Sequence, residues 1–107
     1  MLIHHLALRK HWQEAQRVGH YTWSTRGITI EQEGFLHASR PDQVAGVLAR
    51  FYADVELADL VLLDIETDLL DVPWRIDPVG DDEYPHVYGP LPVAAVVDVR
   101  DVAQIDK

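Results

Sequence analysis

The chain has 107 residues and a formal net charge of −9, with 18 Asp and Glu against 9 Lys and Arg. This acidic excess argues against a protein that binds long nucleic acids or an anionic membrane, because both need surplus Lys and Arg. The sequence contains no cysteine, which excludes disulfides, thiolate catalysis and cysteine-ligated zinc. We expect one domain over residues 1–107, in the cytoplasm, with neither a signal peptide nor a membrane span.

The charge is unevenly divided between the two halves of the chain. Residues 1–53 carry six basic and four acidic residues, a net charge of +2. Residues 54–107 carry three basic and 14 acidic residues, a net charge of −11. The first half can therefore form a local anion site, and we expect a small anionic molecule as the partner.

Two helices are predicted in the N-terminal half. Residues 10–18 have apolar side chains at near-helical spacing, and Gly19 follows in the place of a C′ glycine. Ser39 has the position of an N-cap for a second helix that ends near Ala53, with proline in its first turn. The second helix carries one apolar stripe, which should face the core: Val44, Val47, Leu48, Phe51 and Tyr52.

Strands are predicted where apolar residues run together or alternate. The segment 2–8 should be buried on both faces, and residues 78–84 should form a solvated loop, followed by a turn-rich stretch over 85–92. Helices early and strands late favour an α+β fold with a mainly antiparallel sheet. The predicted strands and extended pieces are 2–8, 20–24, 28–30, 35–38, 60–66, 74–77 and 93–99.

Three histidines are the first candidates for chemistry. His5 and His37 each lie inside a short apolar strand, where a buried imidazole needs a partner for each ring nitrogen. Either one alone is compatible with a satisfied core residue, whereas the pair could share one cleft. His86 lies near Tyr88 in a segment stiffened by prolines, where binding residues are well held or where a structural corner points a side chain at solvent.

Other polar residues allow a functional and a structural interpretation. Arg75 has the fixed fork that suits a carboxylate or phosphate, yet Asp77 and Asp71 are close enough in sequence for an ion pair. Asp64 and Glu66 alternate at a strand end, which is more typical of a solvated end than of a catalytic pair. Tyr21 and Ser24 belong to an aromatic and hydroxyl cluster that could line a pocket or the edge of the core.

Several blocks of the chain resemble one family, the small bacterial proteins of domain-of-unknown-function family 952. The most specific blocks are Glu-Gly-Phe-Leu-His-Ala-Ser at 33–39 and Pro-His-Val-Tyr-Gly-Pro-Leu at 85–91. The likeness covers nearly the whole chain in the same order. The blocks that carry it lie at 3–7, 33–39, 43–45, 51–52, 62–65 and 85–91.

The resemblance implies a remote relation to the ADP-ribosyltransferase fold, which includes the RNA 2′-phosphotransferases. In that fold a split antiparallel sheet holds an NAD-type or ADP-ribose ligand. His5 matches a first-strand histidine near the adenosine-side ribose, and His37 and Arg75 become further pocket candidates. His4 stands where the family usually has tyrosine, Ala38 where it commonly has cysteine, and the usual catalytic glutamate has no clear match.

Three functional hypotheses follow from the sequence. The first is an enzyme or nucleotide-binding protein with a histidine- and arginine-lined cleft for a small anion such as NAD, ADP-ribose or a 2′-phosphate. The second is a metal site on three histidines, and the third is a non-catalytic interaction or regulatory module. Under the first hypothesis His5 and His37 are catalytic, and the ligand-binding residues are Tyr21, Ser24, Ser39, Arg75, His86 and Tyr88.

Overall fold

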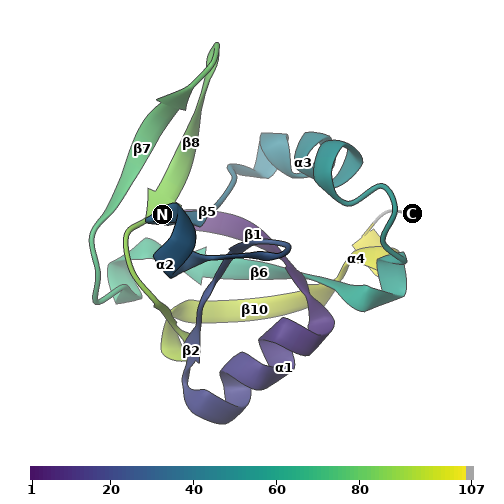
Figure 1. Cartoon of the computed structure of the whole chain (residues 1–107), viewed down its shortest axis with the longest axis horizontal. Helices are drawn as coiled ribbons and strands as arrows, with labels where there is room; N and C mark the ends of the chain where they lie inside the picture. The colour runs from purple at the N-terminus through teal and green to yellow at the C-terminus, as the bar shows by residue number, and fades with distance from the viewer. Residues whose placement is uncertain (106–107) are drawn as a thin grey trace.

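A three-stranded antiparallel sheet forms the centre of the computed structural model, which describes residues 1–105 (Figure 1). Strand β6 (Leu60–Glu66) pairs with β1 (Leu2–Leu8) along one edge and with β10 (Val96–Asp101) along the other. Both β1 and β6 are buried on two faces, as their continuous apolar runs predict. The start of β10 lies three residues later than predicted, because a 3₁₀ turn occupies Val93–Ala95.

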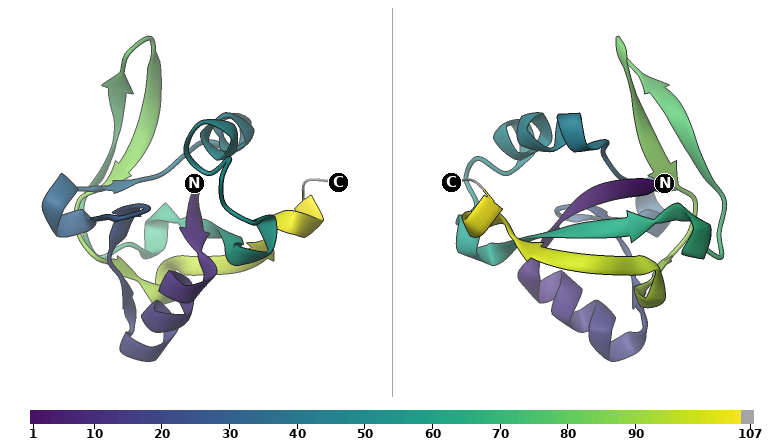
Figure 2. Two further views of the ribbon diagram at one scale, coloured as in Figure 1. Left: turned by 45° about the vertical axis from the view of Figure 1, so that its right-hand side comes forward. Right: turned by 180° about the vertical axis from the view of Figure 1, so that it is seen from behind.

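Helices α1 (Arg9–Val18) and α3 (Val44–Phe51) cover opposite faces of this sheet (Figure 2). On the α1 side, Trp12 packs with the odd-numbered apolar residues of β1 and β6. On the α3 side, Val47 packs with Leu62 and other even-numbered ones. Successive side chains of a strand point to opposite faces, so one sheet contributes to two hydrophobic cores. Both predicted helices are confirmed.

A second three-stranded antiparallel sheet stands beside the first. It is formed by β5 (Leu36–His37), β8 (Asp82–Val87) and β7 (Trp74–Val79), in that order. The β7–β8 hairpin projects from the body of the molecule (Figure 1). The two sheets are joined where the backbones of His4 and Ser39 exchange hydrogen bonds of 2.9 and 2.7 Å. The architecture is therefore α+β with antiparallel strand pairs.

Short elements complete the described part of the chain. None of the helices within residues 1–105 is long and apolar enough to cross a membrane. The remaining turns are 3₁₀ turns at Pro41–Gln43, Leu57–Asp59 and Thr67–Leu69. The remaining strands and helices are β2 (His20–Tyr21), β3 (Trp23–Thr25), β4 (Ile28–Thr29), β9 (Leu91–Pro92), α2 (Ile30–Glu33) and α4 (Val102–Ile105).

The solvated loop predicted over residues 78–84 is wrong. These residues belong to the β7–β8 hairpin, whose turn uses the positive φ of +61° at Gly80. The turn-rich reading of 85–92 is wrong for its first three residues, which complete β8. Proline usually argues against a middle strand, but the carbonyl of Pro85 still accepts from the backbone N of Ala38 at 3.0 Å.

The predicted start of the second helix is also wrong. The backbone of Ser39 pairs with β1, and the helix begins through the 3₁₀ turn Pro41–Gln43. The side-chain oxygen of Gln43 accepts from the backbone N of Arg40 at 2.9 Å. This backbone N–H at the start of the 3₁₀ turn therefore has a partner without a serine cap. The helix ends at Phe51, whose side chain is half exposed although its stripe was expected to face the core.

Candidate functional site

One face of the second sheet carries a row of polar side chains. In the strand register, His37 pairs with His86, and His86 pairs with Arg75 on its other side. Directly paired residues of antiparallel strands project to the same face. The opposite face carries apolar residues such as Leu36 and Val87, which are fully buried. The sheet therefore has an apolar face toward the core and a histidine-bearing face away from it.

The polar row forms a continuous hydrogen-bonded chain. The carboxylate of Asp77 accepts from Nδ1 of His86 at 2.9 Å. Nε2 of His86 lies 3.4 Å from Nδ1 of His37. A neutral His86 that donates through Nδ1 must accept through Nε2, so the hydrogen bonds place the proton of His37 on Nδ1 as well. Within residues 1–105, Nε2 of His37 has no hydrogen-bond partner.

Asp77 is held from two further directions. The hydroxyl of Tyr88 donates to the same carboxylate oxygen that His86 uses. The guanidinium of Arg75 lies 3.6 Å from the other oxygen and 4.4 Å from the centroid of the Tyr88 ring. The Tyr88 hydroxyl, then His86 and Arg75, hold the pKa of Asp77 below its usual value. Asp77 is therefore an ionised acceptor that fixes the tautomer of His86.

His5 supports the other end of the chain from β1. Its Nδ1 donates to the backbone carbonyl of His37 at 2.7 Å, and its Nε2 accepts from the hydroxyl of Tyr21 at 3.1 Å. Burial lowers the pKa of His5 from 6.5 to about 4. Both nitrogens of this buried imidazole are occupied, so His5 fixes the backbone of His37.

His37 is partly buried and neutral at physiological pH. Burial, with smaller effects of His86 and Arg50, lowers the pKa of His37 from 6.5 to about 4. Arg50, on α3, donates to the hydroxyl of Tyr84 at 3.0 Å, and the Tyr84 ring lies 5.1 Å from that of His37. No salt bridge to Arg50 is found in residues 1–105. A cation without a carboxylate partner thus stands near a neutral histidine.

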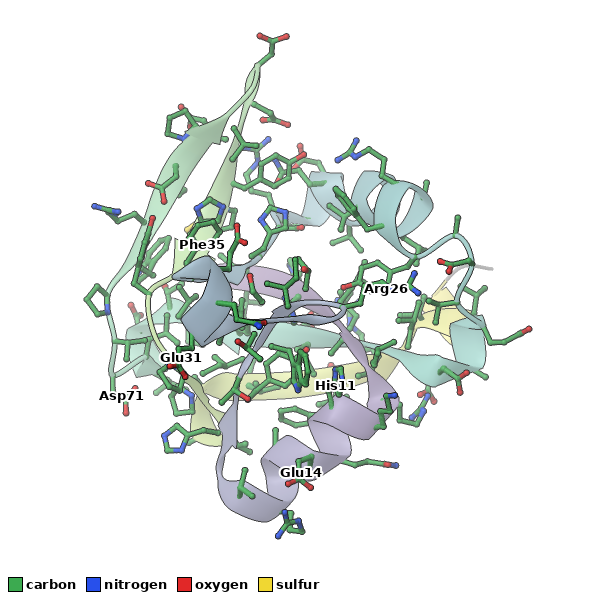
Figure 3. The ribbon with its side chains drawn as sticks, in the orientation of Figure 1. His11, Glu14, Arg26, Glu31, Phe35 and Asp71 are labelled. Carbon is green, nitrogen blue, oxygen red and sulfur yellow. The ribbon has the colours of Figure 1, made fainter. Side chains whose placement is uncertain are left out.

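Two hollows meet at His37. One, of about 230 Å³, is lined by His37, His86 and Phe35, whose ring stacks on that of His86 at 3.9 Å. Figure 3 shows Phe35 between α2 and the base of the β7–β8 hairpin. The other is much narrower and is lined by His5 and Ser39 as well as by His37. Ser24 and Thr25 line both hollows.

Ser24 is the one fully buried side chain of this site without a partner in the described residues. Its residue exposure is 0%, and its Oγ makes no hydrogen bond. A buried hydroxyl without a partner is unfavourable by about 1–3 kcal/mol. Such groups are rare in native structures, and each calls for an explanation such as an ordered water, an ion or a functional role. Ser24 is therefore a buried polar group behind the wall of both hollows whose hydroxyl the described residues leave unsatisfied.

Replacing Ser24 by alanine should stabilise the protein. We expect the free energy of unfolding to rise by about 1 kcal/mol, because the unpaired hydroxyl disappears and little volume is lost. Urea unfolding of the two proteins measures this difference. Thr25→Val on the same wall is the matched control. A clear loss of stability in Ser24→Ala would show that the hydroxyl is satisfied in solution.

A larger hollow, of about 590 Å³, lies elsewhere. It is lined by residues around α2 and by Tyr88, Gly89 and Pro90, and it contains no histidine. Glu31, which Figure 3 labels on α2, is its charged residue. Tyr88 connects this hollow to the site through its bond to Asp77. Size alone does not place chemistry here, because the wall contains no histidine, arginine or lysine.

The structure brings the eight site residues predicted from the sequence into one connected region. Ser39 belongs to this region because it lines the narrow hollow. Its backbone pairs with His4, and it does not cap a helix. Sequence reasoning treated Asp77 only as a possible partner of Arg75 and overlooked Phe35 and Arg50. The sequence does show that Arg75 and Asp77 alternate along β7, which places both side chains on one face of the strand. That this face also carries His86 depends on the register with β8.

The three histidines do not form a metal centre in this arrangement. Both ring nitrogens of His5 are engaged, and His37 and His86 face each other through nitrogens that share a proton. Within the described residues, no group of three or more His, Cys, Asp or Glu is placed to hold a metal ion. The residues present therefore fit proton transfer better than metal binding.

A second buried polar cluster lies apart from the site. Asp64 accepts from Nδ1 of His4 at 2.7 Å and from Nη2 of Arg100 at 2.8 Å. The prediction of a solvated strand end is wrong for Asp64, which is buried. It holds for Glu66, which is partly exposed and pairs with the N-terminal amine. The cluster cross-links the three strands of the central sheet.

Comparison with known proteins gives a family and a fold. The family described as "Protein of unknown function (DUF952)" matches residues 6–99. The crystal structure of protein CC0527 from Caulobacter crescentus is similar, with 29% identity, a TM-score of 0.73, and coverage of 94% of this chain and 85% of that one. Its solution NMR structure gives 30% identity, a TM-score of 0.71, and coverage of 94% and 83%. No curated protein matches.

Proposed function

The chain belongs to the DUF952 family, and we propose that it binds a small anionic molecule beside His37 and exchanges a proton with it. One observation carries the proposal. The chain of Asp77, His86 and His37 ends at Nε2 of His37, which has no partner within residues 1–105, beside the buried Ser24 hydroxyl, which has none there either. Asp77 and His86 act as positioning residues, and His37 is the residue that meets the ligand.

His37 has the properties of a general base. The tautomer imposed by His86 leaves the lone pair of His37 on Nε2, away from the hydrogen-bonded chain. A base with a pKa near 4 is weak, and proton transfer is most efficient when the pKa lies near the working pH. A bound anion would raise the pKa of His37, because a nearby negative charge stabilises the imidazolium. Ligand binding would thus activate the base.

Arginine supplies the counter-charge for the ligand. The guanidinium of Arg50 is close enough to His37 to lower its pKa, and no described carboxylate neutralises it. Arg75 lies at the far end of the row, where its charge is shared with Asp77 and the Tyr88 ring. We therefore assign the anionic group of the ligand to the side of His37 that faces Arg50.

Nucleotides are the class of small anion to test first. The split antiparallel sheets and the histidines on β1, β5 and β8 support the relation to the ADP-ribosyltransferase fold that the resemblance implies. Phe35 stacks on His86 through one face and is partly exposed, so it offers a flat surface on which a ring can stack. NAD, ADP-ribose and 2′-phosphorylated nucleotides are accordingly part of the proposal, with a transferase or hydrolase as the reaction class.

The proposal is tested by titrating the protein with these nucleotides and with inorganic phosphate. We expect saturable binding that weakens at least tenfold in His37→Gln, because the imidazole that contacts the ligand is lost. Binding should also take up protons near pH 6, as the pKa of His37 rises. Calorimetry in buffers of different ionisation enthalpy measures both quantities.

His20→Gln is the matched control, since His20 is exposed on β2, pairs with Pro92 of β9 and lines neither hollow at His37. It makes the same chemical change and should leave binding intact. Absence of saturable binding for every nucleotide and for phosphate would overturn the proposal and favour an interaction module without a ligand. Equal weakening in both variants would also overturn the role of His37.

A further inference from the structure

The mouth of the 230 Å³ hollow is apolar. Ile28 on β4 and Val79 at the end of β7 line it, and they are 41% and 46% exposed. Single exposed apolar side chains are ordinary. Here two of them come from segments about 50 residues apart and meet at the entrance of one hollow. Behind them the ring of Phe35 lies nearly parallel to His86, at an interplanar angle of 19°.

The floor of the same hollow is polar. The polar residues that line the hollow are less exposed than Ile28 and Val79: His37 and Thr25 are partly buried, and His86 and Ser24 are buried. A molecule in this hollow would therefore meet hydrogen-bonding groups at one end and apolar groups at the other. Within residues 1–105, Nε2 of the partly exposed His37 has no hydrogen-bond partner, so it is the polar atom that a molecule in this hollow would contact.

The charged residues Glu33 and Arg50 indicate how a ligand would be oriented in the hollow. Glu33 also lines the hollow and is exposed, as the two apolar residues at the mouth are, so a negative charge at this exposed end would be repelled. Arg50 donates to the hydroxyl of Tyr84 at 3.0 Å, and the Tyr84 ring lies 5.1 Å from that of His37, so a negative charge beside His37 would be attracted toward Arg50. The anionic group therefore lies at the floor, and an uncharged group lies at the mouth.

We propose that the ligand is an anion attached to an aromatic ring, with the ring held among Phe35, Ile28 and Val79. A flat group suits a surface that already stacks one ring on another, and aliphatic side chains on the two strands close over its edges. The position of the anion rests on the proposed function. The aromatic part does not, because it follows from the apolar mouth alone.

Three probes separate the two parts on the full chain: inorganic phosphate, phenyl phosphate and phenol. We expect phenyl phosphate to bind about tenfold more tightly than inorganic phosphate, because part of its ring leaves water. Phenol should shift the amide and methyl resonances of Ile28 and Val79 in NMR spectra. Val79→Ser should reduce the preference for phenyl phosphate severalfold and leave the affinity for inorganic phosphate unchanged.

Val97→Ser is the matched control, because Val97 is a valine of similar exposure, 54%, on β10. It should change neither affinity. Equal affinity of the two phosphates, or an equal effect of both serine variants, would overturn the aromatic ring and leave the proposed function standing. Binding of phenol without binding of inorganic phosphate would support the ring and overturn the anion site. Absence of binding for all three probes would overturn both.

Discussion

Replacing His5 by asparagine should lower the free energy of unfolding by about 2 kcal/mol at pH 7. The amide nitrogen of asparagine can replace Nδ1 as the donor to the His37 carbonyl, but nothing replaces Nε2 as the acceptor from Tyr21. The hydroxyl of Tyr21 is then buried without a partner, since Tyr21 is among the fully buried side chains. Urea unfolding followed by tryptophan fluorescence measures the loss.

Tyr21→Phe tests the reason for this effect. Removing the hydroxyl from both backgrounds forms a double-mutant cycle, which isolates the interaction between the two side chains. The asparagine variant should be less damaging when Tyr21 is already phenylalanine, because no hydroxyl is left unpaired. Additive effects would mean that the bond between the two side chains contributes nothing to stability.

The same histidine should make stability depend on pH. The pKa of His5 is about 4 in the folded protein, lowered by burial, and about 6.5 in an unfolded chain. Between these values the unfolded state binds more protons, so the stabilisation is complete above pH 6.5 and is lost as the pH falls toward 4. In His5→Asn the slope between pH 4.5 and 6 should decrease by up to about 1.4 kcal/mol per pH unit. An unchanged slope would mean that His5 titrates normally.

Much of the fold follows from local patterns in the sequence. The apolar runs at 2–8 and 60–66 are long enough to identify the two innermost strands, and their burial on both faces follows from the absence of polar alternation. The first helix ends at Val18 and is capped by Gly19, whose φ of +98° explains the glycine. In these segments local preference and tertiary packing agree, which is the condition under which such reasoning works.

Elsewhere tertiary contacts override the local signal. Ser39 has the sequence context of a helix cap, but its backbone groups are taken by His4 from a strand 35 positions earlier. Pro85 suggests a turn, yet the surrounding residues of β8 pair on both sides. No local pattern can report a partner that lies far away in the chain, so both segments were misassigned.

The candidate site shows the same limit. The sequence could nominate His5, His37 and His86, because a histidine inside an apolar segment is unusual. It could not show that His37 and His86 face each other across two strands, since this depends on register. Asp77 becomes informative only once β7 and β8 are paired. Residue type identifies candidates, and strand pairing gives each of them its role.

Replacing Asp77 by alanine should disrupt the proton arrangement of the whole row. In water, a free neutral imidazole favours the tautomer with its proton on Nε2, whereas the structure requires Nδ1–H on His86 and on His37. Asp77 imposes this choice as the acceptor for His86. Without it, His86 should return to a mixture of tautomers, and the lone pair of His37 should no longer be fixed on Nε2.

Nitrogen-15 NMR of the histidine side chains at pH 7 measures the tautomers directly. We expect Nδ1–H signals for His86 and His37 in the unmodified protein and averaged signals in Asp77→Ala. When the tautomers are no longer ordered, the proton uptake that accompanies ligand binding should decrease. Turnover of any substrate should decrease about 100-fold, within the range typical of general-base catalysis. Asp77→Asn should retain part of the effect, because an amide oxygen can still accept from Nδ1.

Asp81→Ala provides the matched control, since Asp81 is exposed at the tip of the same hairpin. It removes the same charge and should leave the tautomers of both histidines unchanged. Persistence of Nδ1–H on His86 in Asp77→Ala would show that another group orders the ring, and the chain from Asp77 to His37 would lose its first step. A change in tautomer without any change in ligand binding or turnover would make the row a structural feature of the sheet, with the chemistry elsewhere.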